Sequence, residues 1–529
     1  MARPARPPTL TVDHHGPAPT EPCDRTAVDA RARIGRGELS PVELLESCLA
    51  RIEATDPGVN AMVVRADEQA RAGAARAADA VVAARRNGTD LPPLHGLPVA
   101  VKDLQATAGL RTTYGAEAFA DHVPSRDDGI VARVRAGGGI VLGKTNIPER
   151  SIGANTVNRL FGATGNPFDP ALSCGGSSGG SAVAVATGMA PLATGSDHGG
   201  SLRIPACYCG VVGYRATPGV VPFDERTTPQ TYYSVLGPMA RTVGDTALLL
   251  SVIAARGRPP GPNRGPVPPV DPMAFPLDAP ALARLDDIDP STLRVGVSPD
   301  LGGVLVSRAV RDTFNHRVSL LAGAVGRCDE VDLDLSTAAD VDWRLRADVF
   351  VTQYHEERAA WDEGFNPNIV ATYEGALTTP MEDIAVARGR QLDLIHSAAR
   401  LFDRVDVVVC PGVSVPPFPW DELYPRTVDG APVDNYMAWL TLTAAITVIG
   451  HPVVAVPCGR DATGLPFGLQ VIGPRFADRR VLSVARALER IFAGDPSTAR
   501  PVPDLVPLTT DRHGLRTRGR TVQLQRPAD

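Results

Sequence analysis

"SCGGSSGGSAVAVATGMAPLATGSDHGGSLRIPACYCG", residues 173–210, is the stretch around which this chain is organised. It contains two glycine-flanked serine clusters that are joined by a run of small residues. Ser177 and Ser178 lie in the first cluster, and Ser201 lies in the second. Glycine lets backbone N–H groups approach a reacting centre and adopts backbone angles that other residues resist. We expect the small-residue run to form a helix packed deeply against a sheet, which would bring both clusters to one site.

Strands and helices alternate along the rest of the chain. The stretch "SPVELLESCLARIEATDP" (40–57) has a serine cap, a proline in the first turn and apolar residues at helical spacing. An alanine-rich segment that ends at Gly88 predicts a second helix. Short apolar runs such as "LPVAVKD" (97–103) and "IVLGKTN" (140–146) predict strands. The fold class is therefore α/β, with one large, mixed and mainly buried sheet covered by helices on both faces.

The composition divides the chain into a main body and two ends. Residues 1–22 are rich in proline and polar residues, which predicts a flexible segment. Residues 23–496 form the main domain, and the proline-dense stretch at about 256–280 reads as a surface insert within it. Residues 497–529 have little apolar periodicity, so we expect a peripheral tail.

The charge distribution argues against two classes of partner. The formal net charge is −6 and there are no acidic or basic runs, so neither nucleic acid nor an anionic membrane is expected to bind. The N-terminus has no apolar core of the kind that a signal peptide needs. The weakly polar run 439–457 contains Gly450 and Pro452, so it predicts a buried helix followed by a strand. We expect a cytoplasmic protein.

The eight cysteines show neither metal-ligand spacing nor a dense disulfide framework. Cys207 and Cys209 would share one face of a strand, too close together for easy bridging. "HEER" (355–358) lacks the HExxH spacing of a zinc site. We expect buried free thiols, no metal and no cofactor.

Lysine is almost absent from this chain. Of 53 cationic residues only Lys102 and Lys144 are lysine, and the others are arginine. Arginine cannot be deprotonated in a protein, whereas a buried lysine can lose its proton and act as a base. Lys102 is the candidate base. Lys144 has no serine partner in the sequence, so we expect it to pair with a carboxylate or to cap a strand end.

Other interpretations of the glycine-serine tract are weaker. The tract itself contains no GxxxxGK[ST] pattern and no lysine, which argues against a phosphate-binding loop there. "GGSSG" (175–179) fits the nucleophile elbow of the α/β-hydrolases, but that motif needs a strand immediately before the serine. The preceding "NPFDPALSC" (166–174) predicts a loop because of its prolines and aspartate. A Ser-His-Asp hydrolase is therefore disfavoured.

The motifs together resemble the amidase signature family. "GGSSGGSA", then "GSDHGGSLRIPA" with its second serine 24 positions after Ser177, and the upstream "GLPVAVKD" carry the resemblance, which extends over roughly residues 25–495. It implies the amidase-signature fold and a Ser–cis-Ser–Lys catalytic unit. Carried over to this sequence, the nucleophile is Ser201, the bridging serine is Ser177 and the base is Lys102.

The chemistry of these residue types fits the roles that the resemblance implies. A serine hydroxyl is a poor nucleophile until a neighbour removes its proton. Burial would lower the pKa of the Lys102 amine, which would accept a proton from Ser177 as Ser177 takes one from Ser201. Ser177 would then return the proton to the leaving amine. The backbone N–H groups that we expect in the oxyanion hole are those of His198, Gly199, Gly200 and Ser201.

Several neighbours of the serines are expected to support the loops. Ser178 is expected to form hydrogen bonds within its own loop. Asp197 and Arg203 are expected to brace the second cluster, because charged groups near a buried turn need partners. No acidic residue that would orient His198 can be identified from the sequence, so we expect this side chain to line the pocket or to face away.

Two aromatic stretches are candidates for the substrate pocket. Residues 227–242 contain Tyr232 and Tyr233, and residues 343–365 contain Trp361. Ordinary core packing explains any single one of these rings equally well, so that alternative stays open.

The substrate class is predicted more coarsely than the family. Ile204 stands where the amidase subunit of tRNA-dependent amidotransferases tends to carry a polar residue, and the usual "LKPTYG" continuation of that subunit is absent. We therefore expect an amidase for small, partly apolar amides, with the carbamate or ester hydrolases of the same scaffold as alternatives. The expected partner is a small-molecule substrate, bound by a monomer or homodimer.

Overall fold

The computed structural model describes residues 20–521, except 227, 229–230, 232, 256–270, 272, 276, 363–364 and 434. Nearly all of the predicted flexible segment, most of the proline-rich insert and Tyr232 lie outside the described residues. The described end of the insert packs on the body, where the Phe275 ring stacks on Phe476 with the ring centroids 4.2 Å apart.

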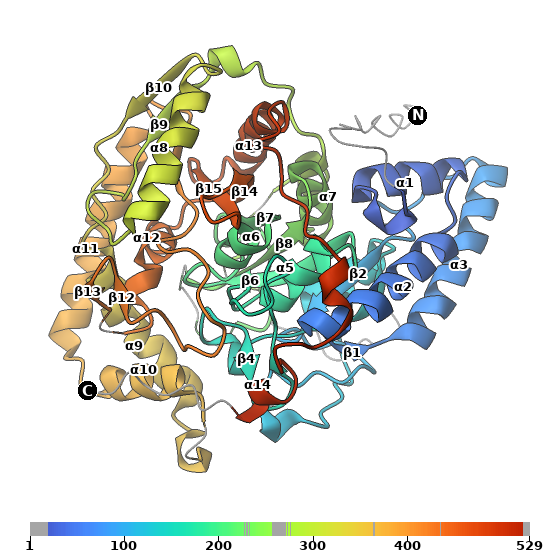
Figure 1. Cartoon of the computed structure of the whole chain (residues 1–529), viewed down its shortest axis with the longest axis horizontal. Coiled ribbons are helices and arrows are strands. Elements are labelled where there is room, and N and C mark those ends of the chain that lie inside the picture. The colour runs from blue at the N-terminus through green and yellow to red at the C-terminus, as the bar shows by residue number, and fades with distance from the viewer. Residues whose placement is uncertain are drawn as a thin grey trace.

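An eleven-stranded sheet runs through the centre of the molecule, in the order β1-β3-β2-β6-β8-β7-β14-β15-β11-β9-β10 (Figure 1). The strands are β1 (Met62–Arg65), β2 (Pro98–Lys102), β3 (Ile140–Thr145), β6 (Leu192–Asp197), β7 (Val212–Arg215), β8 (Val235–Ala240), β9 (Arg294–Val297), β10 (Arg327–Glu330), β11 (Val407–Pro411), β14 (Val453–Arg460) and β15 (Pro466–Ile472). Two short hairpins lie outside this sheet, formed by β4 (Val157–Asn158) with β5 (Gly162–Ala163) and by β12 (Thr427–Val428) with β13 (Ala431–Pro432). Strand β2 pairs in parallel with β3 and β6, whereas β6–β8 and β14–β15 are antiparallel, so the sheet is mixed as predicted.

Helices cover both faces of the sheet, which confirms the predicted fold class. They are α1 (Ala27–Arg36), α2 (Pro41–Val59), α3 (Asp67–Asn87), α4 (Gly129–Ala136), α5 (Gly179–Ala186), α6 (Arg203–Cys209), α7 (Val243–Ile253), α8 (Arg308–Ala322), α9 (Ala338–Tyr354), α10 (Pro367–Leu377), α11 (Met381–Leu401), α12 (Thr441–Ile449), α13 (Asp478–Ala493) and α14 (Arg518–Thr521). Helices α5 and α6 pack on the sheet and on each other, and so do α7 and α13. Helix α9 contacts α10, α11 and α12, and this group forms one side of the molecule (Figure 1).

Local capping signals determine several helix ends. Helix α2 begins after Ser40, whose hydroxyl and the Glu43 carboxylate form a capping box. Helix α3 ends at Gly88, which has a left-handed φ of 65°. The run 439–457 contains α12 and then β14, as expected.

The prediction that Cys207 and Cys209 lie on a strand was wrong. Both lie on α6, because Pro205 fits the first turn of a helix and Gly210, with a φ of 63°, ends it. All eight thiols are free, and all except that of Cys328 are buried.

The C-terminal segment lies against the first part of the chain. Leu508 and Leu515 are buried, and the Leu515 carbonyl accepts a hydrogen bond from the Ala163 amide. Arg516 forms an ion pair of 2.8 Å with Asp56 at the end of α2. The described part of the segment is thus packed on the body of the molecule, and the division of 497–529 from the main domain as a peripheral tail stays a prediction.

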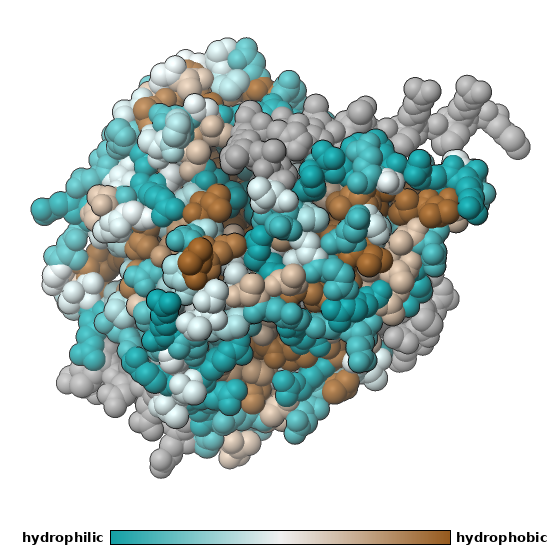
Figure 2. All heavy atoms as spheres, turned by 45° about the vertical axis from the view of Figure 1, so that its right-hand side comes forward, coloured by the Kyte–Doolittle hydropathy of each residue, from teal (hydrophilic) through white to brown (hydrophobic). Residues whose placement is uncertain are grey.

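On the face drawn in Figure 2, apolar side chains lie in separate groups among polar ones. Among the described residues, no helix combines the length and the apolar character needed to cross a bilayer.

Candidate active site

Three neighbouring segments bring the predicted residues together. Lys102 is the last residue of β2, which lies beside the parallel strand β6. Ser177 and Ser178 immediately precede α5, and Ser201 lies in the turn between β6 and α6. Because β2 and β6 run in the same direction, their carboxyl ends meet at one edge, where the two serine clusters converge.

The Lys102 amine is surrounded by hydroxyl groups. Its Nζ lies 2.8 Å from Ser177 Oγ, 2.9 Å from Ser178 Oγ and 2.8 Å from Ser196 Oγ. Lys102 is fully buried and forms no ion pair with a carboxylate among the described residues. Burial lowers the pKa of this amine well below its ordinary value, and the charge of Asp197 only partly opposes that shift. Burial thus shifts this amine toward its neutral form, the form that a base requires.

Small residues allow the serine clusters to approach this amine. Every residue of α5 is buried, and a side chain at Gly180 would lie 2.4 Å from the Asn146 amide nitrogen of the loop that follows β3. Gly200 has a φ of 124°, and a side chain there would meet Thr443 Oγ1 at 2.4 Å. The glycines are thus needed for close packing at the site. The Gly176–Ser177 peptide bond is cis.

A buried ionic cluster holds the turn that carries Ser201. The Asp197 carboxylate accepts from Arg203 Nε at 3.0 Å and from Arg215 Nη1 at 3.2 Å. It also accepts from the Gly200 and Leu202 amides, each at 3.1 Å. Burial raises the pKa of this carboxyl, but the two guanidinium groups and the amides outweigh it, so that the pKa lies below its ordinary range. Asp197 stays ionised and fixes the turn.

The predicted oxyanion donors differ in their availability. The Gly200 amide already donates to Asp197. The amides of His198, Gly199 and Ser201 have no acceptor among the described residues. Three of the four predicted N–H groups are therefore free to bind an oxyanion.

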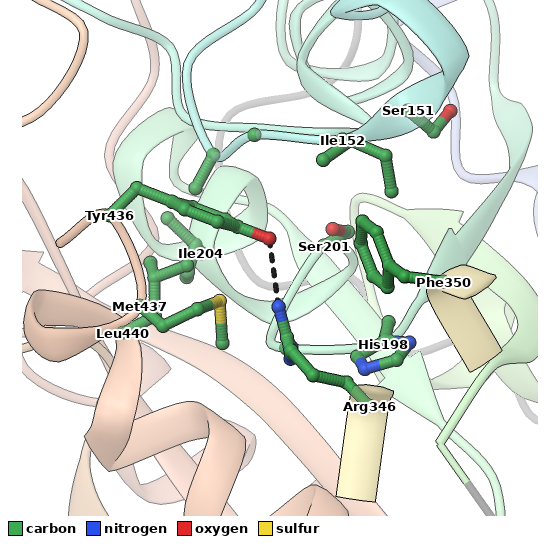
Figure 3. Close-up of a pocket in the computed structure, with 13 residues that line it drawn as sticks. Ser151, Ile152, His198, Ser201, Ile204, Arg346, Phe350, Tyr436, Met437 and Leu440 are labelled. Carbon is green, nitrogen blue, oxygen red and sulfur yellow. Dashed lines mark hydrogen bonds between the residues drawn. The ribbon is translucent and has the colours of Figure 1, made fainter. Parts of the chain in front are cut away.

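The Ser201 side chain borders a pocket that is partly open to solvent. Its hydroxyl has no hydrogen-bond partner among the described residues. Most of the lining is apolar, and a few polar groups lie at one end (Figure 3). The lining residues are Ser151, Ile152, Gly153, Ala154, His198, Gly199, Ser201, Ile204, Arg346, Phe350, Tyr436, Met437 and Leu440.

One wall of this pocket has an unusual backbone. Arg150 and Ser151 are successive non-glycine residues with left-handed φ values of 54° and 61°. The Asn366 side-chain amide holds the wall by donating to Ile152 O at 2.8 Å and to Glu149 O at 3.1 Å. Such conformations persist where the surrounding structure enforces them, and they cluster at functional sites.

His198 lines the pocket, and neither of its ring nitrogens is bonded to the Ser201 hydroxyl. Nδ1 lies 3.2 Å from Ser234 Oγ, and Nε2 lies 3.9 Å from Asp342 Oδ1. The carboxylate that the sequence did not reveal is therefore Asp342, on α9. Because neither nitrogen is bonded to Ser201, this geometry is unlike a Ser-His-Asp triad. Burial lowers the pKa of His198 well below its ordinary value, and the positive charges of Arg346 and Arg215 lower it further.

Of the aromatic residues nominated from the sequence, Tyr233 and Trp361 do not line this pocket, and Tyr232 lies outside the described residues. Tyr233 packs behind His198, with the ring centroids 5.2 Å apart. Trp361 stacks on Phe365, and both partly buried rings pack against a small cluster that contains Phe350. Of the nominated stretch 343–365, Arg346 and Phe350 reach the pocket instead.

The hydrogen-bond partners of Lys144 differ from the carboxylate that was expected. Its amine donates to the Gln105 carbonyl and, at 2.9 Å, to Thr107 Oγ1. Burial lowers its pKa to about 8, against the charges of Asp103 and Asp128. Nearby carboxylates thus act at longer range than a direct ion pair. Among the described residues, no group of three or more His, Cys, Asp or Glu side chains is placed to hold a metal ion.

The profile of the family described as Amidase matches residues 43–482, which is most of the chain. The chain belongs to the amidase family. This confirms the family predicted from the two serine clusters and the upstream lysine, and it makes the protein an amide-hydrolysing enzyme.

Relatives of this amidase include hydrolases and transferase subunits. The acylamidase of Rhodococcus erythropolis is 32% identical over 473 residues, which cover 88% of this chain and 95% of that protein. A glutamyl-tRNA(Gln) amidotransferase subunit of Chloroflexus aurantiacus is 32% identical over 496 residues, with 88% and 96% covered. The crystal structure of a bacterial aryl acylamidase of the amidase signature family superposes with a TM-score of 0.77 at 25% identity, covering 95% of this chain and 99% of that one.

Proposed function

We propose that this amidase hydrolyses small, partly apolar amides through an acyl-enzyme on Ser201, with Ser177 and Lys102 as the proton relay. The observation that carries the proposal is the Lys102 amine, which is fully buried, lacks a carboxylate partner among the described residues and lies 2.8 Å from Ser177 Oγ. A lysine with a lowered pKa is a base that an adjacent serine can use.

The hydrogen-bond capacity of a neutral amine fits this relay. Such an amine has two N–H hydrogens and one lone pair, and Lys102 has three hydroxyl neighbours. The Ser178 hydroxyl donates to Ser196 O at 3.2 Å, so it accepts from Lys102. The lone pair of Lys102 is then available to the hydroxyl hydrogen of Ser177.

In the first step, Ser201 Oγ attacks the substrate carbonyl carbon and gives its proton to Ser177, which passes its own proton to Lys102. The carbonyl oxygen becomes an oxyanion that the free amides of His198, Gly199 and Ser201 can bind. Lys102 returns the proton through Ser177 to the amine nitrogen as the C–N bond breaks. Water then attacks the ester carbonyl of the acyl-enzyme and gives a proton to the same relay, which returns it to Ser201 Oγ as the ester C–O bond breaks and the acid leaves.

The lining of the pocket supports the substrate class. Ile204, Phe350 and Leu440 present apolar side chains beside Ser201, which suits a small, partly apolar acyl group. Carbamates and esters share the acyl-enzyme chemistry, so they are the alternative substrates. Monomer or homodimer, and a cytoplasmic location, stay predictions.

A component of an amidotransferase is the second candidate function, because proteins of that kind are 32% identical to this chain. Ile204 weighs against it, since this apolar side chain lines the pocket where the amidotransferase component tends to carry a polar residue. A hydrolase that works alone is therefore favoured.

The proposal is tested with an alkyl amide, an anilide, an aryl carbamate and an aryl ester of one acyl size. We expect the wild type to cleave at least one of them and Ser201→Ala to lower kcat/KM by at least about 10³-fold. Mass spectrometry of the quenched reaction should find the acyl group on Ser201. Ser181→Ala is the matched control, since this buried serine bonds Thr194 O and does not touch Lys102. Full activity of Ser201→Ala, or no cleavage of any substrate by the wild type, would contradict the proposal.

A further inference from the structure

The polar end of the pocket is formed by two side chains from distant parts of the sequence. Arg346 on α9 donates through Nη1 to the Tyr436 hydroxyl at 2.8 Å. Arg346 Nη2 forms an ion pair of 3.0 Å with Asp342, and both side chains are 2% exposed. In Figure 3, the hydrogen-bonded pair of Arg346 and Tyr436 lies beside Ser201, and the Arg346 guanidinium lies over the Phe350 ring, 5.7 Å from its centroid.

This end of the pocket has unused hydrogen-bond donors. Arg346 Nε is buried and has no acceptor among the described residues. The Tyr436 hydroxyl accepts from Arg346, so its own hydrogen remains, and no acceptor for it is found in the described part of the chain. Buried donors are paired in nearly all proteins, so two unpaired ones beside a nucleophile indicate a ligand with an acceptor atom.

The charges at this end favour a neutral acceptor over an anionic one. The Arg346 cation is already neutralised by Asp342. An added carboxylate would therefore lie near the Asp342 carboxylate without a free cation to pair with it. His198 adds no positive charge, because its pKa is lowered and the ring stays neutral. A carbonyl oxygen accepts hydrogen bonds without bringing a charge.

We propose that Arg346 and Tyr436 bind a second, neutral carbonyl oxygen of the substrate, so that this enzyme prefers amides whose acyl group carries a keto or acylamino carbonyl. The inference rests on the proposed function, because it takes Ser201 as the atom that faces the scissile amide. The apolar lining holds the carbon chain between the two carbonyl groups, while Arg346 and Tyr436 determine specificity.

Three amides of matched size test the preference: pentanamide, 4-oxopentanamide and 3-carboxypropanamide. The second has a carbonyl in place of one methylene, and the third has a carboxylate oxygen in place of the terminal methyl of the second. Binding is measured by calorimetry with Ser201→Ala, which keeps the pocket and removes turnover. We expect the Kd of 4-oxopentanamide to be about tenfold lower than that of each of the other two.

Two variants on the Ser201→Ala background separate binding from structure. Tyr436→Phe removes one hydroxyl and should reduce the preference to about twofold or less, leaving the Kd of pentanamide within about twofold. Removing Arg346 alone would strand the buried Asp342 charge. The double variant Asp342→Asn/Arg346→Gln avoids this, and it should also lose the preference.

Equal affinity of Ser201→Ala for pentanamide and 4-oxopentanamide would overturn the inference. So would tightest binding of 3-carboxypropanamide, which would show an anion site, or an equal loss for all three ligands in Tyr436→Phe. Hydrolysis by the wild type is followed separately. If Ser201→Ala shows the binding preference but the wild type hydrolyses none of the amides, the proposed function fails and the second carbonyl site stands. If the wild type hydrolyses the amides but Ser201→Ala shows no preference, this inference fails and the proposed function stands.

Discussion

The two lysines of this amidase lie on adjacent strands and have different surroundings. Lys102 ends β2 and Lys144 lies on β3, where it pairs with Val101 in the parallel register. Both side chains are fully buried. Burial lowers the pKa of both amines, yet that of Lys144 falls only to about 8, whereas that of Lys102 lies well below its ordinary value.

The difference comes from the groups near each amine. Three serine hydroxyls contact Lys102, and Asp197, whose charge opposes the shift, is already engaged by Arg203 and Arg215. Lys144 instead contacts the Gln105 carbonyl and Thr107, with Asp103 and Asp128 near enough to favour its charged form. Burial alone therefore does not make a base. We infer that Lys102 is the better base because Asp197, whose charge acts on its amine, is already paired with Arg203 and Arg215.

The largest expected effect is the loss of activity in Lys102→Met. Methionine has a similar volume and no titratable group, so the variant should fold and lose at least about 10³-fold in kcat/KM. Lys102→Arg should be equally inactive, since arginine keeps its proton. The same methionine substitution at Lys144 is the matched control and should stay within about tenfold of wild type.

Equal loss of activity in the two methionine variants would contradict this comparison, provided that circular dichroism shows both proteins to be folded. Lys144 would then be needed for catalysis, and the contrast in surroundings would not explain function.

The part of this site that a sequence can predict is the part encoded in local motifs. Ser177 and Ser201 lie in glycine-rich runs, and Lys102 is conspicuous in a chain that uses arginine almost everywhere else. The sheet and its helices were predicted for a related reason, because caps, glycine stops and apolar periodicity act over a few residues. Ser196 was missed because a single serine at a strand end has no distinctive local pattern.

The pocket could not be predicted in the same way. Arg346 and Tyr436 are far apart in the sequence and meet only because α9 packs beside the segment before α12. Tyr233 and Trp361 were nominated for their aromatic rings, and a ring alone does not distinguish a pocket from a core. Asp342, close to His198, was hidden by the same long sequence separation.

A smaller effect on activity is expected from removing the Ser196 hydroxyl, which contacts the Lys102 amine. The wild-type kcat/KM should rise as the pH increases through the lowered pKa of Lys102 and then level off, because only the neutral amine accepts a proton. The Ser196 hydroxyl accepts from the amine and stabilises its charged form. Ser196→Ala should therefore move the rising limb to lower pH and reduce the plateau by about tenfold or less.

This shift is measured by full pH profiles of kcat/KM for the wild type, Ser196→Ala and the control Ser181→Ala. A shift of the limb to higher pH in Ser196→Ala, or an equal shift in Ser181→Ala, would count against Ser196 as a partner of the Lys102 amine in the proposed relay.

The smallest effect on activity, and a measurable one on stability, is expected at Lys144. Its pKa of about 8 in the folded protein lies below that of an exposed lysine, about 10.4. Between these values the unfolded chain holds more protons than the folded one, so stability rises with pH in that window. The free energy of unfolding of the wild type, measured in urea relative to Lys144→Met, should therefore increase by about 2–3 kcal/mol from pH 7.5 to 10. A difference between the two proteins that stays constant over this range would show that Lys144 titrates like an exposed lysine, and the comparison with Lys102 would then rest on the hydroxyl contacts alone.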